Sequence, residues 1–279
     1  MAPRERLAKP LRVPSDTVHR IAFTGSPGAG KSSLIAEWCS LRMRSDRDVG
    51  VVAIDPSSPL SGGSLLGDRI RMEKVDPQGS FFFRSLPSQG MRDGLCQNIA
   101  GVLDCLEEHD FDDVVLETVG IGQGEYASRN LVDTLVVVLV PESGDTIQAM
   151  KAGLLEVADI YVVNKSDLPG AARLRQELAS ILKLKPSRDS GWNAPIIDVS
   201  NGKKPSGHDA LDEAIRKHKA FVEANVSPEE RTQSRKRQKI SEVFLSEFEE
   251  RLGGLKDSAF STDERDLFDQ VLSQMLHSQ

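Results

Sequence analysis

Cysteine and histidine are scarce in this 279-residue chain, and those present are not arranged as metal or disulfide sites. The three cysteines, Cys39, Cys96 and Cys105, are odd in number and contain no C-x-x-C pair. This pattern predicts neither a disulfide framework nor a zinc site. Five histidines without clustered cysteines also leave no evident set of ligands for nickel. We therefore expect a reducing compartment, the cytoplasm.

Long hydrophobic runs and an excess of positive charge are also lacking. Residues 1–16 carry arginines and prolines but not the continuous apolar stretch of a secretory signal. No later run is long and apolar enough to span a bilayer. The formal net charge of -7 disfavours nonspecific binding to nucleic acid. We therefore expect no membrane insertion and no nucleic-acid partner.

Seven short apolar runs alternate with amphipathic stretches along most of the chain. They are "RIAFTG", "GVVAID", "SFFFRS", "DDVVLE", "DTLVVVLV", "DIYVVN" and "APIIDVS", each of which is predicted to be a buried strand. Apolar runs of strand length separated by helical patterns are typical of βαβ units. The pattern predicts an α/β fold with a doubly wound, mostly parallel sheet, in which ligands bind beyond the carboxyl ends of the strands.

The segment "GSPGAGKSS", residues 25–33, matches G-x-x-x-x-G-K-S between a predicted strand and a predicted helix. Glycines let backbone N–H groups face a phosphate, and the start of the helix adds positive potential. Lys31 is placed to reach the β and γ phosphates, and Ser32 to ligate Mg²⁺. The residues predicted to bind the phosphates are Gly25, Pro27, Gly28, Ala29, Gly30, Lys31, Ser32 and Ser33.

The segment "DIYVVNKSDLPG" ends a predicted strand with Asn164, Lys165 and Asp167, the N-K-x-D arrangement that P-loop GTPases use for guanine. A carboxylate at Asp167 accepts hydrogen bonds from the ring N–H and the amine of guanine, a donor pair that adenine lacks. Asn164 is expected to brace neighbouring loops, and the stem of Lys165 to cover the base. The motif predicts GTP rather than ATP. A further base-contacting loop is assigned to Ser200 and Asn201.

Acids that end strands are predicted to gather around the metal ion. Glu117 closes "DDVVLE", and Gly120 is expected to offer its backbone N–H to the γ phosphate. A carboxylate buried there is compensated by Mg²⁺ and its waters. Asp55 closes "GVVAID", and Asp68 lies in the glycine-rich stretch "SLLGDRIRM". The predicted metal ligands are Ser32, Asp55, Asp68 and Glu117.

The chain beyond residue 227 loses the alternation and follows helical spacing. An apolar face is formed by Ile240, Val243, Phe244, Phe248 and Leu252. Gly253 and Gly254 interrupt it, and Ser261 with Glu264 matches a capping box that opens a further helix. This C-terminal helical hairpin either packs back on the sheet domain or forms an arm for dimerisation or a partner.

These signals divide the chain into three parts. Residues 1–18 form an N-terminal extension, residues 19–226 a P-loop GTPase domain, and residues 227–279 a C-terminal helical arm. The arm contains a basic cluster that is predicted to be a solvated helix face. Its members are Arg231, Arg235, Lys236, Arg237 and Lys239.

Taken together, these motifs resemble the ArgK/MeaB family of P-loop GTPases, the metallochaperone G-proteins that serve adenosylcobalamin-dependent methylmalonyl-CoA mutase. The resemblance rests on "GSPGAGKSS", "DPSSPLSGGSLLGDRIRM", "ETVGIGQGE" and "ESGDTIQAMKAGLLEVADIYVVNKSD". It implies GTP hydrolysis coupled to a cobalamin mutase, by a homodimer whose C-terminal arms embrace. It also implies that residues 142–151 communicate with the mutase through Asp145, Gln148 and Lys151. Older descriptions call the family a kinase linked to arginine and ornithine transport.

The sequence departs from the family at three places. Gly124 stands where the family usually has serine, Asp93 where it has a glycine, and Asn201 where its Ser-Ala loop has alanine. The departures leave the predicted nucleotide site intact. They leave the identity of the partner open.

The expected reaction is attack of water on the γ phosphate, with Mg²⁺, Lys31 and backbone N–H groups neutralising charge. Ile121 directly follows Gly120, so the water-orienting glutamine of some GTPases is missing there, and Gln123 is the candidate for that role. The predicted catalytic residues are Lys31, Glu117 and Gln123. We expect slow intrinsic turnover that rises when a partner reshapes the loops. A kinase and a nucleotide-gated binding module remain alternatives.

Overall fold

The computed structural model describes residues 18–55, 81–88, 96, 98–109, 111–118, 128–141, 157–184, 191–202, 205–255 and 263–277. The strands are β1 (His19–Thr24), β2 (Val49–Asp55), β3 (Phe81–Pro87), β4 (Asp113–Glu117), β5 (Thr134–Leu139), β6 (Ile160–Val163) and β7 (Ile196–Asp198). The main helices are α2 (Lys31–Met43), α4 (Ile99–Glu108), α8 (Ala171–Leu184), α9 (His208–Asn225), α10 (Pro228–Gly253) and α11 (Glu264–His277). None of the helices in these ranges has the length and apolarity to cross a membrane.

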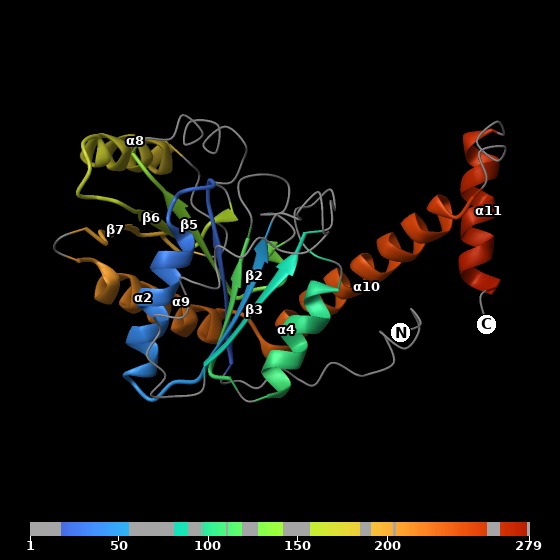
Figure 1. The fold of residues 1–279 in the computed structure, drawn as a ribbon, viewed down its shortest axis with the longest axis horizontal. Helices are drawn as coiled ribbons and strands as arrows, with labels where there is room; N and C mark the ends of the chain where they lie inside the picture. Colours follow the sequence, from blue (N-terminus) through green and yellow to red (C-terminus); the bar gives the residue numbers. More distant parts are fainter. Residues whose placement is uncertain are drawn as a thin grey trace.

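All seven predicted strands are present, and they form one parallel sheet in the order β3-β2-β4-β1-β5-β6-β7. β1 lies where the chain changes direction, with β2 to β4 on one side and β5 to β7 on the other (Figure 1). Ligands of open α/β sheets bind beyond the carboxyl ends of the strands at such a switch point. The predicted doubly wound fold is confirmed, and the phosphate loop follows its central strand.

Helices cover both faces of the sheet, because the central strands present apolar side chains on alternate sides. On one face α2 and α9 contribute Trp38 and Ile215 to the core that contains Phe23 of β1. On the other face α4 places Leu103 in the core that contains Leu116 of β4, and α8 covers β5 and β6. Burial from both sides explains why these strands are nearly continuous apolar runs.

The two edge strands are less buried than their apolar sequences predict. The first four residues of β3 alternate between half-buried and exposed, the last three are half-buried, and Phe82 exposes 40% of its surface. In β7, Ile196 and Ile197 are half-buried and Asp198 is exposed. An apolar run shows that a strand can be buried. How far burial extends depends on the place of the strand in the sheet, which the run itself does not encode.

Helix α10 begins with a capping box that the predicted hairpin does not include. Ser227 Oγ accepts a hydrogen bond from the N–H of Glu230 at 3.1 Å, and the Glu230 carboxylate accepts one from the N–H of Ser227 at 2.9 Å. The helix ends at Gly253, where the glycine pair predicts an interruption. α11 begins at Glu264, whereas Ser261 of the predicted capping box lies outside the described residues.

The prediction of a solvated basic face in residues 231–239 is wrong for two of its members. Arg235 and Lys239 are buried and form ion pairs with α4. Arg235 Nη1 lies 2.8 Å from Glu107 Oε1, and Lys239 Nζ lies 2.7 Å from Asp104 Oδ2. The sequence pattern misses these pairs because the compensating acids are 128 and 135 residues away along the chain.

The same acids bind Arg20 of β1, so the ion pairs form one network. Arg20 Nη2 lies 2.8 Å from Asp104, and Arg20 Nε lies 2.7 Å from Glu107. Arg235 also pairs with Asp133, just before β5, at 2.8 Å. Removal of one partner from a buried pair costs about 3–5 kcal/mol, because an uncompensated charge stays buried. The network therefore fixes the first half of α10 to the sheet domain.

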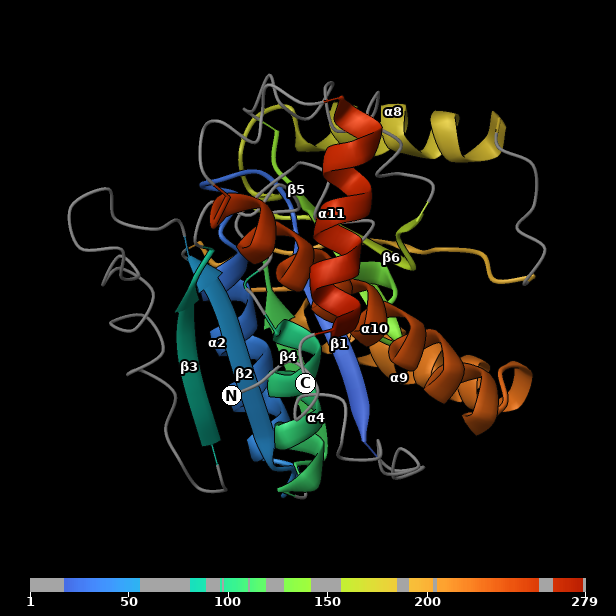
Figure 2. The ribbon, with the colours of Figure 1, turned by 90° about the vertical axis from the view of Figure 1, so that its right-hand side faces the viewer.

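The second half of α10 projects from the domain, and α11 lies against it (Figures 1 and 2). The rings of Phe248 and Phe268 have centroids 5.5 Å apart and join the two helices. The structure thus confirms that part of the C-terminal hairpin packs back on the domain, and a role of the hairpin in dimerisation or partner binding stays a prediction. The root of the hairpin packs back on the domain, and its distal part forms an arm. The three-part division of the chain stays a prediction.

Glu242 reaches from α10 to the first turn of α4, where its carboxylate accepts a hydrogen bond from the N–H of Ala100 at 3.3 Å. Burial, assisted by the nearby charge of Asp104, raises the pKa of Glu242 from 4.5 to about 7. Between these pH values the folded protein holds a proton that the unfolded chain has lost. The stability contributed by this group therefore falls as the pH rises through this window and is constant above it.

We expect the free energy of unfolding of the Glu242→Gln variant to increase relative to that of the wild type as the pH rises, because the variant has no carboxyl group to lose a proton at this position. Between about pH 5 and about pH 8 the difference should grow by about 2–3 kcal/mol, the order of magnitude implied by the raised pKa. Urea unfolding at a series of pH values between about 5 and about 8 measures it. Glu249→Gln, at an exposed position of the same helix, is the matched control and should show no trend. Parallel pH profiles for the wild type and E242Q would contradict the prediction.

Candidate functional site

The phosphate loop connects β1 to α2 at the carboxyl edge of the sheet. Its glycines Gly25, Gly28 and Gly30 have positive φ angles of 146°, 76° and 84°, which L side chains rarely adopt. Lys31 folds back over the loop. Its Nζ donates hydrogen bonds to the carbonyl oxygens of Gly25 at 2.8 Å and Ser26 at 3.3 Å. The ammonium group is thus held at the loop that is predicted to bind phosphate.

Ser32, in the first turn of α2, donates its hydroxyl proton to Glu117 Oε1 at the end of β4, over 2.8 Å. Each side chain is buried, with 4% of the residue surface exposed. The contact is possible because β1 and β4 are neighbours, with Phe23 opposite Glu117. A hydroxyl and a carboxylate are oxygen ligands of the kind that Mg²⁺ prefers, and Mg²⁺ usually takes few protein ligands and keeps several waters. The donor set therefore fits Mg²⁺.

Asp55 closes β2 at the same edge and is buried. β4 pairs Glu117 with Ala53, so Asp55 lies two residues further along than Glu117 in the direction of the strands. The Asp55 carboxylate accepts a hydrogen bond from the hydroxyl of Ser85 in β3. Ser85 thus orients this acid, although no sequence motif marks it. Within the described residues no three His, Cys, Asp or Glu side chains cluster as a complete metal site.

Asn164, directly after β6, joins the predicted guanine motif to the phosphate loop. Its Nδ2 donates a hydrogen bond to the carbonyl oxygen of Ala29 at 2.7 Å, and its backbone N–H donates to Leu139 at 2.8 Å. A Cβ atom on Gly30 would lie 2.7 Å from Asn164 Nδ2. Only glycine therefore permits this approach. The contact has the bracing geometry that the sequence motif leads us to expect.

Asp167, the predicted guanine acceptor, is exposed and held from the side by the loop after β7. Ser200 Oγ donates a hydrogen bond to Asp167 Oδ1 at 2.6 Å and accepts one from the N–H of Gly202 at 3.1 Å. A Cβ atom on Gly202 would lie 2.6 Å from Asp167 Oδ2. The turn around Ser200 therefore determines the direction of the Asp167 carboxylate. No sequence motif marks Gly202, and only its place in this turn reveals its contact with Asp167.

Lys165 lies between Asn164 and Asp167 with a φ angle of 55°. A non-glycine residue in the left-handed region persists when the surrounding structure determines its conformation. Here Ser166 supplies part of that constraint, because its N–H donates to the carbonyl oxygen of Val199 at 3.0 Å. The loop after β6 is thus tied to the strand end that presents Ser200.

Comparison with known proteins bears on this arrangement. A family model described as "Methylmalonyl Co-A mutase-associated GTPase MeaB" matches residues 4–256. A putative GTPase of Pyrococcus horikoshii is 38% identical over 245 residues, which are 83% of this chain and 77% of the relative. The chain belongs to the MeaB/ArgK family of GTPases. GTPase ArgK of Escherichia coli K12 is 35% identical over a match that covers 74% of this chain and 63% of ArgK.

A solved structure extends the comparison to the fold of this MeaB family GTPase. The crystal structure of an LAO/AO transport system kinase has a TM-score of 0.64 and 24% sequence identity. The alignment covers 95% of this chain and 84% of that one. At this identity the likeness shows the fold alone. It agrees with the doubly wound sheet and the C-terminal helices described above.

Not all predicted site residues of the MeaB family chain can be placed. Those within the described residues that gather at the carboxyl edge are Gly25, Pro27, Gly28, Ala29, Gly30, Lys31, Ser32, Ser33, Asp55, Glu117, Asn164, Lys165, Asp167, Ser200 and Asn201. Pro27, Ser33 and Asn201 are exposed there. Asp68, Gly120 and Gln123 lie outside the described residues, as do residues 142–151.

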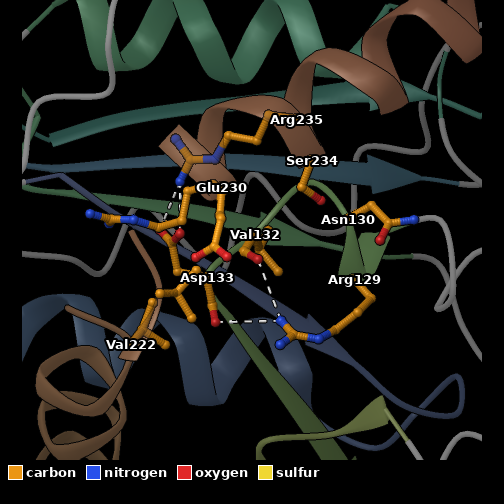
Figure 3. Close-up of a pocket in the computed structure, with 10 residues that line it drawn as sticks. Arg129, Asn130, Val132, Asp133, Val222, Glu230, Ser234 and Arg235 are labelled. Atoms are coloured by element: carbon orange, nitrogen blue, oxygen red, sulfur yellow. Dashed lines mark hydrogen bonds and ion pairs between the residues drawn. The ribbon is translucent and has the colours of Figure 1, made fainter. Parts of the chain in front are cut away.

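A pocket of about 200 Å³ lies at the opposite edge of the sheet, at the root of α10 (Figure 3). Its charged groups already have partners. Arg235 points at Asp133, and Arg129 Nη1 lies 3.4 Å from the carbonyl oxygens of Val132 and Asp133 and 3.3 Å from Asp159 Oδ2. No residue of the predicted nucleotide site lines it. The pocket is a gap beside the ion-pair network and is separate from the GTPase site.

We expect Gly202→Ala to weaken binding of guanine nucleotides by roughly tenfold, because the added methyl group displaces the Asp167 carboxylate. Stability should change by no more than about 0.5 kcal/mol, since the displaced atom ends an exposed side chain. Calorimetric titration with GDP measures the affinity. Gly253→Ala is the control, because nothing lies within 4 Å of the Cβ position there. Unchanged GDP affinity in G202A would show that the turn does not direct Asp167.

Proposed function

We propose that this MeaB family GTPase hydrolyses GTP to GDP with Mg²⁺ and acts as a chaperone or gate for an adenosylcobalamin-dependent acyl-CoA mutase. The proposal that the protein hydrolyses GTP rests on the buried contact between Ser32 and Glu117. Ser32 directly follows Lys31 of the phosphate-loop motif. The family description, which names methylmalonyl-CoA mutase, supports the partner.

Ser32 and Glu117 would hold Mg²⁺, with Asp55 at the same edge and Asp68 as the remaining predicted ligand. Bound there, Mg²⁺ supplies positive charge to the phosphate oxygens. Lys31 is expected to exchange its backbone carbonyl partners for the β and γ phosphates, because bonds between two charged groups are stronger than bonds to neutral carbonyls.

Guanine specificity is assigned to Asp167. A carboxylate has about four acceptor positions, so the hydrogen bond from Ser200 leaves capacity for the two guanine donors. Asn164 would brace the base loop against the phosphate loop, and Lys165 and Asn201 would border the base. Gly120 and Gln123 keep their predicted roles at the γ phosphate and the attacking water.

We expect the isolated protein to hydrolyse GTP slowly, and an adenosylcobalamin-dependent methylmalonyl-CoA mutase to raise kcat by about tenfold or more. Phosphate release with and without purified mutase measures the effect. Lys31→Ala should abolish hydrolysis in both cases, because the positive charge at the phosphates is lost.

Three outcomes discriminate among the functions. Fast hydrolysis without a partner, or no response to the mutase, would contradict the proposed coupling. If K31A binds the mutase in a GTP-dependent manner as tightly as the wild type, the protein is a nucleotide-gated binding module whose hydrolysis is incidental. Transfer of the γ phosphate to arginine, ornithine or a transport protein would favour the kinase alternative instead.

The arm is proposed to form a homodimer. Beyond the ion-pair network, α10 and α11 expose large apolar side chains at 46–48% of their surface, namely Ile240, Phe244, Leu245 and Phe268. Several of them on one projecting element are unusual for a monomer and are typical of an interaction surface. A second copy would present the same face and bury both.

We expect the double substitution of Phe244 and Leu245 by serine to convert a dimer into a monomer, because it removes the apolar contact area at the centre of the proposed interface. Sedimentation equilibrium measures the mass in solution. Exposed Glu249 and Glu250 on the same helix provide a matched control when both are changed to serine. A monomeric wild type, or a dimer that survives in F244S/L245S, would overturn the proposal.

A further inference from the structure

Thr118, the residue after β4, is attached to β1 by two hydrogen bonds. Its backbone N–H donates to the carbonyl oxygen of Phe23 at 3.1 Å. Its hydroxyl donates to the hydroxyl oxygen of Thr24 at 2.9 Å. Thr24 has no exposed surface and Thr118 exposes 4%. The hydroxyl bond is therefore shielded from water, and it lies directly before the phosphate loop.

The side chains of Glu117 and Thr118 belong to opposite faces of the sheet, because side chains alternate along a strand. Leu116, which shares its face with Thr118, lies in the core under α4. Val115, which shares its face with Glu117, lies in the core under α2. Glu117 accordingly meets Ser32 on the α2 side, while Thr118 meets Thr24 on the α4 side.

The place of this second contact has a mechanical consequence for Glu117. The ends of secondary-structure elements open most easily, and the last paired residue opens first. The backbone bond of Thr118 belongs to the last pair of this ladder, Phe23 with Glu117, whereas its hydroxyl bond to Thr24 lies one residue beyond that pair. The hydroxyl bond therefore joins the two chains directly beyond Glu117, the last paired residue, and opposes opening of the ladder there. This keeps the Glu117 carboxylate in a defined position relative to α2.

Stability by itself gives a poor reason for this hydroxyl pair. Two buried hydroxyl groups bonded to each other add little net stability over apolar groups of the same shape. The bond does impose a direction and a distance, which apolar packing at a strand end does not. This favours a role in orientation over a role in folding.

We propose that Thr118 is a positioning residue, whose bond to Thr24 holds the Glu117 carboxylate against Ser32 at the metal-binding edge. The proposal rests on the Mg²⁺ role assigned above to Ser32 and Glu117. It assigns Thr118 no contact with nucleotide or metal.

The first test uses the nucleotide-free protein and so does not depend on the Mg²⁺ role. In Thr118→Val the hydroxyl is replaced by a methyl group of similar size, and we expect amide hydrogen exchange at the end of β4 to rise roughly tenfold. Thr118→Ser keeps the hydroxyl and should restore slow exchange. Equal exchange in the wild type and T118V would overturn the proposal.

The second test measures GDP affinity by calorimetry with Mg²⁺ and with a chelator. Without Mg²⁺, T118V should bind GDP with the affinity of the wild type. The increase in GDP affinity on addition of Mg²⁺ should be roughly tenfold smaller in T118V than in the wild type, and T118S should recover it. Thr134→Val is the matched control. Thr134 is equally buried and bonds His19 and His218 at 2.7 Å each, but it starts β5 at the opposite sheet edge.

The outcomes separate the two proposals. A wild type without any Mg²⁺-dependent gain contradicts the metal role, and the exchange experiment then decides the role of Thr118. A normal gain in T118V, or an equal loss of the gain in T134V, contradicts the positioning role while the metal role stands. Failure of T118S to restore the gain contradicts it as well, because serine supplies the same donor.

Discussion

The nucleotide site of this GTPase depends on the parallel pairing of β1 with β4. This pairing places Phe23, near the end of β1, opposite Glu117, which ends β4, and the loop after β1 then brings Ser32 of α2 to Glu117 in a buried position. Two oxygen groups from segments 85 residues apart can meet there without a long loop. Because the strands are buried on both faces, the sheet edge is rigid enough to hold the Glu117 carboxylate in one position, as the proposed Mg²⁺ site requires.

The residues predicted to bind guanine are also positioned by contacts at the carboxyl edge of the sheet. Asn164 and Asp167 come from one strand end, and their positions are set by contacts with neighbouring loops. Close backbone approach at Gly30 and Gly202 makes these contacts possible. The proposed specificity for guanine would therefore depend on glycines that position Asn164 and Asp167. Substitution at either position is expected to act through the side chain that it displaces.

The ion-pair network at the root of α10 serves another purpose. It joins the arm to α4, β1 and the start of β5, and leaves the distal apolar face of the arm available. Buried ion pairs are weak evidence for stability, but they oppose slippage, because each charge has only one compensated position. An arm fixed in this way keeps a constant relation to the sheet. That relation is consistent with the proposed role of the arm in dimerisation.

The sequence by itself determined the sheet, the phosphate loop and the guanine motif, because strand periodicity and loop chemistry are local and short. The strand runs, residues 25–33 and the N-K-x-D segment all carry their signal within about a dozen neighbours. Only the tertiary structure decided that Arg235 and Lys239 are buried, that Phe82 lies on an exposed edge, that Gly202 lies against Asp167 and that Thr118 bonds Thr24. The physical reason is that burial and contacts depend on partners that are distant in the sequence. The residues next to a charged residue or a glycine do not indicate which partners it will meet.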